Sequence, residues 1–147
     1  MQRCLKTLIC AIALMTGMAS ASASDATMAT LYKSPTCECC GKYVEYLEKN
    51  GFTVKAINED DMNAIKKRYG TARIASCHTM LVEGYVVEGH VPVRAIRKLL
   101  SEKPDIVGIS APGMPQHSPG MGEERPGTLT IYAIPKGKAK PTVFSVE

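Results

Sequence analysis

Four of the six cysteines are the residues of this sequence best suited to chemistry. Cys37, Cys39 and Cys40 fall within four consecutive positions, and Cys77 follows at a distance. A thiolate is both a nucleophile and a ligand for soft metal ions. The cluster therefore indicates either dithiol redox chemistry, through the C-x-x-C pair of Cys37 and Cys40, or the binding of a soft metal.

The spacing of the cysteines argues against structural disulfides alone. Two disulfides among these four cysteines would need one bond within residues 37–40, and such short-range bonds are usually reducible and functional. A closed zinc site usually draws on two separated pairs of ligands. Adjacent thiolates at Cys39 and Cys40 are better suited to bridging several soft ions, of which Cu(I) is the one that thiolates favour. We therefore expect a multinuclear copper site.

Two of the three histidines, His78 and His90, follow Cys77 in the sequence within 13 residues. His78 comes directly after Cys77 and fits a metal ligand and a hydrogen-bonded structural residue equally well. His90 precedes Pro92 at the predicted start of a helix, where capping or packing is the simpler interpretation. Only His78 is therefore counted as a candidate copper ligand.

A later segment, residues 111–122, is rich in proline and glycine and is predicted to be an irregular loop. Met114, His117 and Met121 lie in this loop, where no periodic apolar face requires them. Thioether and imidazole groups both bind copper. These three residues are therefore further candidate copper ligands.

The pattern of apolar residues predicts the elements that carry these side chains. The cysteine loop, residues 34–41, separates a strand from a helix that Gly51 ends, so the thiols lie where a helix N-terminus favours thiolate. Up to residue 104, the predicted elements are a strand at 28–33, a helix at 42–50, a strand at 52–57, a helix at 58–69, strands at 79–82 and 85–88, and a helix at 92–102. Beyond it, we expect an irregular segment that ends in a hairpin of strands 129–134 and 142–146.

This β-α-β-α-β-β-α order resembles the thioredoxin fold. The resemblance implies an α/β domain, residues 24–104, in which a parallel βαβ unit joins an antiparallel ββα unit in a four-stranded sheet. In that fold the loop before the third strand packs against the redox loop. Here that loop is residues 75–79, which contain no proline and would bring Cys77 and His78 towards the other cysteines. Residues 105–147 would form an extension that contributes to the metal site.

Residues 1–23 have the pattern of a cleaved signal peptide. Basic residues precede an apolar run at 7–18, and small residues at 19–23 predict cleavage near Ala23. The run is shorter than the roughly 20 residues of a membrane span. We therefore expect an exported, periplasmic protein that does not insert into the membrane.

Removal of this segment would take away Cys4 and Cys10 and leave 124 of the 147 residues, enough for one domain with a modest core. The formal net charge would fall from +4 to +2. This small charge, without a basic cluster, argues against nucleic-acid binding. We expect a monomer.

Three linked motifs resemble one family. Residues 32–42, residues 75–79 with 83–92, and residues 112–115 with 118–121 are similar to the CxCC-motif copper resistance proteins of Gram-negative bacteria. These are called CopG-type proteins and are unrelated to the DNA-binding repressor of that name. The resemblance implies a periplasmic thioredoxin-like domain whose cysteine sulfurs bridge a cluster of copper ions, and which interconverts Cu(I) and Cu(II) in copper detoxification. A copper efflux system or a redox protein would be its partner.

By position, this resemblance makes Cys37, Cys39 and Cys40 ligands of the copper cluster. The full set of expected copper ligands is Cys37, Cys39, Cys40, Cys77, His78, Met114, His117 and Met121.

The sequence leaves three functions open. The first is copper binding with interconversion of Cu(I) and Cu(II), which would make the protein a copper oxidoreductase. The second is a periplasmic thiol-disulfide oxidoreductase, in which the catalytic residues are Cys37, which attacks, and Cys40, which resolves the mixed disulfide. The third is a copper chaperone without redox turnover.

Overall fold

The computed structural model describes residues 26–147, so the predicted signal peptide with Cys4 and Cys10 lies outside the described residues. The strands are β1 (Thr27–Lys33), β2 (Phe52–Asn58), β3 (Thr79–Val82), β4 (Tyr85–Glu88), β5 (Gly108–Ser110), β6 (Thr130–Ile134) and β7 (Thr142–Val146). The helices are α1 (Glu38–Lys49), α2 (Met62–Tyr69), α3 (Val93–Glu102) and the short 3₁₀ helix η1 (Ala72–Ile74). None of these helices is long and apolar enough to cross a membrane.

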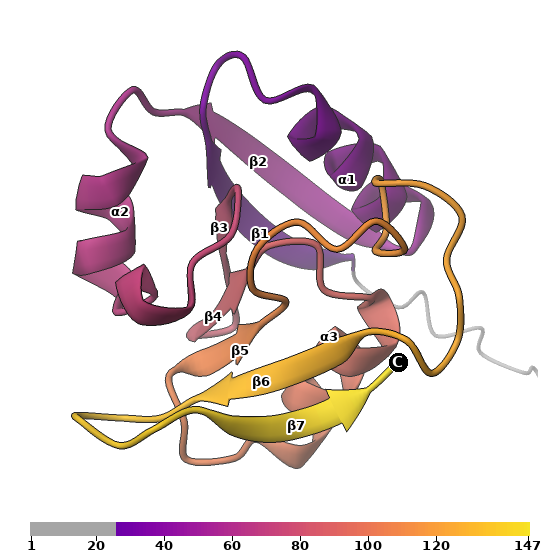
Figure 1. Cartoon of the computed structure of the whole chain (residues 1–147). Helices are drawn as coiled ribbons and strands as arrows, with labels where there is room; N and C mark the ends of the chain where they lie inside the picture. The colour runs from indigo at the N-terminus through magenta and orange to yellow at the C-terminus, as the bar shows by residue number, and fades with distance from the viewer. Residues whose placement is uncertain (1–25) are drawn as a thin grey trace, which may run out of the picture.

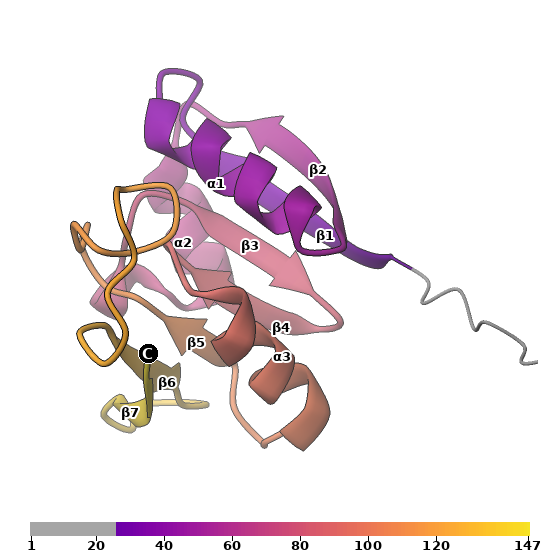
Figure 2. The same cartoon turned by 90° about the vertical axis from the view of Figure 1, so that its right-hand side faces the viewer.

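All seven strands belong to one mixed sheet in the order β2-β1-β3-β4-β5-β6-β7 (Figure 1). β1 pairs with β2 in parallel, while β1 with β3 and β3 with β4 are antiparallel. Helices α1 and α3 cover one face of the sheet and α2 covers the other (Figure 2). This arrangement confirms the thioredoxin-like α/β fold expected from the element order.

The extension continues the sheet instead of standing apart from it. β5 pairs in parallel with β4, and β6 and β7 follow as antiparallel neighbours. The terminal hairpin was predicted, but β5 was not. At three residues, β5 is too short to show a periodic pattern, and its partner β4 lies about 20 residues earlier in the chain.

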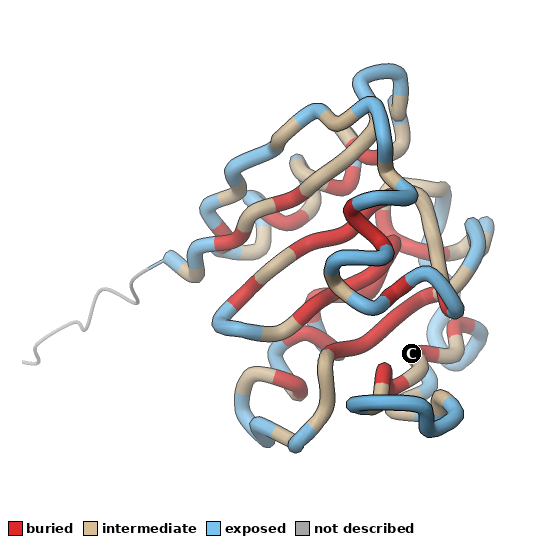
Figure 3. Tube along the Cα trace, turned by 90° about the vertical axis from the view of Figure 1, so that its left-hand side faces the viewer, coloured by how far each residue is buried: buried red, intermediate tan, exposed pale blue. Residues whose placement is uncertain are grey.

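The main core lies between the sheet and helices α1 and α3. Tyr43 and Leu47 of α1 and Ile96 and Leu99 of α3 are fully buried there, against the inner face of the central strands. The apolar residues of α3 recur every three or four positions, which places them on one face of the helix. Figure 3, which views the sheet from the side of α2, shows that the buried stretches follow the central strands.

Helix α1 begins earlier than expected. The predicted start was residue 42, but Cys37 is the N-cap and the helix begins at Glu38. A turn in which the Cys37 amide donates to the Ser34 carbonyl oxygen (3.1 Å) leads directly into the first helical turn. Gly41 does not delay the helix, because a glycine costs only about 1 kcal/mol in a helix. Cys39 and Cys40 are therefore helical residues, not loop residues.

Candidate metal centre

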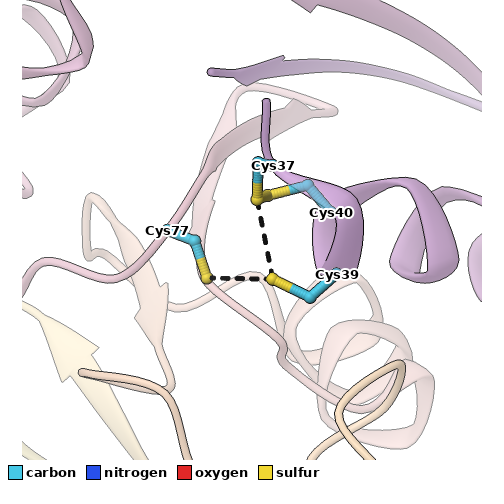
Figure 4. Close-up of side chains that lie close together, drawn as sticks. All are labelled: Cys37, Cys39, Cys40 and Cys77. Carbon is cyan, nitrogen blue, oxygen red and sulfur yellow. Dashed lines mark hydrogen bonds between the residues drawn. A yellow bond between two sulfur atoms is a disulfide. The ribbon is translucent and has the colours of Figure 1, made fainter. Parts of the chain in front are cut away.

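The four cysteines of the described chain converge at the N-terminus of α1 (Figure 4). Cys37, Cys39 and Cys40 come from the N-cap and first turn, and Cys77 comes from the segment between η1 and β3. Their sulfur atoms all lie within 4.8 Å of one another. Cys37 and Cys40 form a disulfide, whereas Cys39 and Cys77 are free thiols. The Cys39 sulfur lies 3.6 Å from that of Cys37 and 4.0 Å from that of Cys77.

A second group of donors overlaps the first. The ligand atoms of Cys40, Cys77, His78 and His90 also lie within 4.8 Å of one another. Cys40 and Cys77 belong to both groups, so their sulfurs occupy the position that bridging ligands would need. We call the six residues of the two groups the metal centre.

His90 was assigned to capping or packing in the sequence, and the structure places it in the metal centre. Pro92, not His90, is the N-cap of α3. In the β3–β4 hairpin Thr79 is paired with Glu88, and the same register continued beyond the strands sets Cys77 opposite His90. The two-residue turn at Glu83-Gly84 is the sequence signal from which this pairing follows.

Contacts at both ring nitrogens orient the imidazole of His90. Its Nδ1–H donates to the Pro119 carbonyl oxygen at 2.7 Å, which leaves the Nε2 lone pair facing the Cys77 sulfur at 3.2 Å. Burial lowers the pKa of His90, and burial together with the Cys39 sulfur raises the pKa of the Cys77 thiol to about 11. In the metal-free protein a neutral thiol therefore donates to a neutral imidazole.

His78 is fully buried, and neither of its ring nitrogens has a hydrogen-bond partner. Its ring packs against those of Tyr43 and His90, with centroid distances of 4.6 and 4.8 Å. Burial, with smaller contributions from His90 and Lys66, lowers the pKa of His78 well below its usual value. Buried polar atoms without partners are rare. This neutral imidazole therefore has a lone pair available for a metal ion, and thiols with neutral imidazoles are a donor set that suits copper.

A buried carboxylate holds the segment that carries Cys77 and His78. Glu88 Oε1 accepts hydrogen bonds from the Ser76 amide (2.7 Å) and from Lys66 Nζ (2.5 Å), and its Oε2 accepts one from the Thr79 hydroxyl (2.6 Å). Ser76 and Thr79 bracket the two candidate ligands, so Glu88 fixes both ends of their segment. Sequence reasoning missed this contact, because Lys66 has the position of a solvent-facing residue in the last turn of α2.

Gly89 makes this close arrangement of backbone segments feasible. A Cβ atom at this position would lie 2.3 Å from the Ser76 hydroxyl oxygen and 2.7 Å from the Ala111 carbonyl oxygen. Its φ angle of +76° is also one that other residues rarely adopt. A side chain here would clash with Ser76 and Ala111 and force these segments apart.

Residues 111–122, which we call the strap, run from β5 up to α1 (Figure 1). Gly120 packs so closely that a Cβ atom would lie 3.0 Å from the Tyr43 amide nitrogen. Pro119 reaches His90, as described above, and Gly113 accepts a hydrogen bond from the Ser76 hydroxyl. The strap therefore closes the metal centre from the side of the extension.

The three candidate ligands of the strap lie in different surroundings. His117 donates through Nδ1 to the Glu123 carbonyl oxygen at 3.1 Å, and it lines a surface pocket with Tyr46 and Arg94, outside both donor groups. Met114 is 57% exposed to solvent, and Met121 is partly buried directly after Gly120. Copper ligation by these three side chains stays a prediction.

Comparisons with known proteins found one family model and two similar solved structures. A family model described as "Protein of unknown function, DUF411" matches residues 74–121. Two solved structures, described as copper resistance protein CopG in form 1 and form 2, are each 36% identical to this chain with a TM-score of 0.74. The matches cover 82% of this chain, 98% of form 2 and 97% of form 1. The comparison with curated proteins gave no match.

Proposed function

Since this chain belongs to the family of CopG copper resistance proteins, we propose that it binds copper ions as its cargo through the six side chains of the metal centre. The observation that carries this proposal is the overlap of two four-donor groups at Cys40 and Cys77. One group offers four sulfur atoms, and the other offers two sulfur atoms and two neutral imidazoles. Soft sulfur and imidazole are donors that suit copper.

The overlap also supports a multinuclear cluster. Two ions held by the two groups would share the sulfurs of Cys40 and Cys77, and thiolates bridge soft ions readily. Cys37 and Cys40 contribute as ligands only when their disulfide is reduced, because a metal binds the thiolate. The reduced protein is therefore the form that carries the cluster.

We propose interconversion of Cu(I) and Cu(II) as the reaction, with copper as the substrate, in the periplasm. Oxidising one Cu(I) releases one electron, which a redox partner protein accepts, and a copper efflux system is a second expected partner. The scaffold favours such a reaction, because Glu88 fixes the segment that carries Cys77 and Pro119 orients the imidazole of His90 before any metal binds.

The Cys37–Cys40 disulfide supports a second candidate, a thiol-disulfide oxidoreductase. Cys37 is partly exposed and Cys40 is fully buried, as an attacking and a resolving thiol would be. This activity would need no metal. A copper chaperone without redox turnover is a third candidate, which an electron-transfer assay on the copper-loaded protein separates from the first.

Copper stoichiometry tests the main proposal. The protein is reduced, loaded with Cu(I) without oxygen, and freed of excess metal, and we expect more than one copper ion per chain. One ion or none would refute the cluster. Insulin reduction by the metal-free protein would instead support the oxidoreductase.

A further inference from the structure

The Cys37–Cys40 disulfide divides the metal centre. Neither sulfur of a disulfide is a thiolate, so the four-sulfur group loses two of its donors when the disulfide forms. The second group loses only Cys40. Its remaining donors are one thiol and two imidazoles, from Cys77, His78 and His90, and their ligand atoms still lie within 4.8 Å of one another.

These three donors are already oriented in the disulfide form. The Pro119 carbonyl oxygen fixes the tautomer of His90 so that Nε2 faces the Cys77 sulfur at 3.2 Å. His78 is completely buried beside them with both ring nitrogens unpartnered. Buried unpartnered groups are rare in native proteins, and a bound ion is one of the explanations for them. Access is open from the side of Cys77, which is only partly buried.

We propose that the disulfide form of this protein holds a single copper ion on Cys77, His78 and His90. The inference rests on the copper binding proposed above and adds a second copper-bound form, in which the Cys37–Cys40 disulfide is intact. One thiolate with two imidazoles is the donor set of mononuclear trigonal copper sites. Cys39, although its sulfur lies 4.0 Å from that of Cys77, is a member of the four-sulfur group only.

Copper capacity then depends on the redox state of the Cys37–Cys40 pair. A dithiol reductant transfers two electrons and two protons to the disulfide, becomes a disulfide itself, and restores the thiols of Cys37 and Cys40. The protein passes from one bound ion to several. In an oxidising compartment it keeps a copper-binding form without any reductant.

Counting ions in the two redox forms tests the inference. The purified disulfide form is titrated with Cu(I) without oxygen, the ions per chain are counted by native mass spectrometry, and alkylation with peptide mapping verifies that Cys37 and Cys40 remain unmodified. We expect one ion in this form and more than one after reduction. No ion, or several ions, in the disulfide form overturns the inference while the proposed function stands, provided that the reduced form binds several. No ion in either form overturns both.

The identity of the ligands gives a second measurement. Copper X-ray absorption of the loaded disulfide form should show one sulfur and two nitrogen neighbours. A shell of two sulfurs, from Cys39 and Cys77, would overturn the assignment. His78→Gln and His90→Gln should each weaken binding at least tenfold in this form. If either variant fails to fold, as circular dichroism would show, the absorption data on the unsubstituted protein decide.

Discussion

Nε2 of His90 lies 3.2 Å from the sulfur of Cys77, although twelve residues and a complete hairpin separate them in the chain. The opposite nitrogen of the same ring donates to Pro119 in the strap. One imidazole thus joins the segment before β3, the segment after β4 and the C-terminal extension. A metal-binding histidine whose second nitrogen donates to a carbonyl oxygen has its tautomer fixed in this way.

His90 should contribute more to copper binding than His117 does. We expect His90→Gln to lower the Cu(I) affinity of the reduced protein at least tenfold, because it removes an oriented donor. His117→Gln is the matched comparison, since His117 lies outside both donor groups, and it should lower the affinity less than His90→Gln does. Competition with a chromophoric Cu(I) chelator measures both, and equal losses would contradict the assignment of His90.

Cys39 separates copper binding from thiol-disulfide exchange. Cys39→Ser should reduce the number of bound Cu(I) ions, because its sulfur lies within 4.0 Å of the Cys77 sulfur in the four-sulfur group. A thiol-disulfide oxidoreductase would tolerate Cys39→Ser and lose activity with Cys37→Ser. Copper stoichiometry and insulin reduction, measured on both variants, distinguish the two functions. Full copper loading of Cys39→Ser would show that Cys39 is not a ligand of the cluster.

Glu88 should support both the fold and the metal centre. Glu88→Gln leaves the Lys66 ammonium buried without its charged partner, which costs about 3 kcal/mol in the free energy of unfolding. Adding Lys66→Met to this variant should restore part of that loss, because no unpaired charge then remains. Urea unfolding measures the free energy of unfolding of each variant. The control is Glu102→Gln at the exposed end of α3, which should change this free energy by less than about 0.5 kcal/mol. An unchanged free energy of unfolding in Glu88→Gln would show that the buried contact contributes little.

Gly120 should hold the strap against α1. Gly120→Ala places a methyl group 3.0 Å from the Tyr43 amide nitrogen at a φ angle of +78°, and the left-handed conformation alone costs about 1–2 kcal/mol. We expect the strap to detach locally, so that His90 loses its Pro119 acceptor. Nitrogen NMR of the imidazole should then report mixed tautomers in place of one. Gly113→Ala, where the added Cβ has no neighbour within 4 Å, controls for the backbone strain alone.

Acid should destabilise the metal-free protein through His78. Burial lowers the pKa of this imidazole below its ordinary value of 6.5, so the unfolded chain binds a proton that the folded protein does not. Stability is then complete above pH 6.5 and falls as the pH drops below that value, by roughly 1 kcal/mol per pH unit. Chemical unfolding at a series of pH values should show this slope, and His78→Phe should reduce it. An unchanged slope in that variant would assign the acid sensitivity to other groups.

The element order was predictable because its signals are local. The apolar spacing of α3, the Asp61 cap of α2, the left-handed Gly51 after α1 and the Glu83-Gly84 turn all act over a few residues. The same local signals were too coarse to place the start of α1, where four residues separate the prediction from the structure. They were silent on β5, whose identity as a strand comes from pairing with β4.

The cysteine cluster and its soft-metal or redox chemistry could be read from residue types and spacing alone, because Cys37, Cys39 and Cys40 share one turn of chain. The resemblance to the thioredoxin fold brought Cys77 and His78 towards them, but the place of His90 beside them could not be predicted, since it depends on how distant segments pack. The hairpin register sets His90 opposite Cys77, the buried Glu88 fixes the ends of the segment that carries Cys77 and His78, and Gly120 lets the strap approach α1. The sequence by itself determined the reactive groups and the elements that carry them. Only the tertiary structure decided which of those groups meet, because such contacts depend on strand register and close backbone packing over long chain separations.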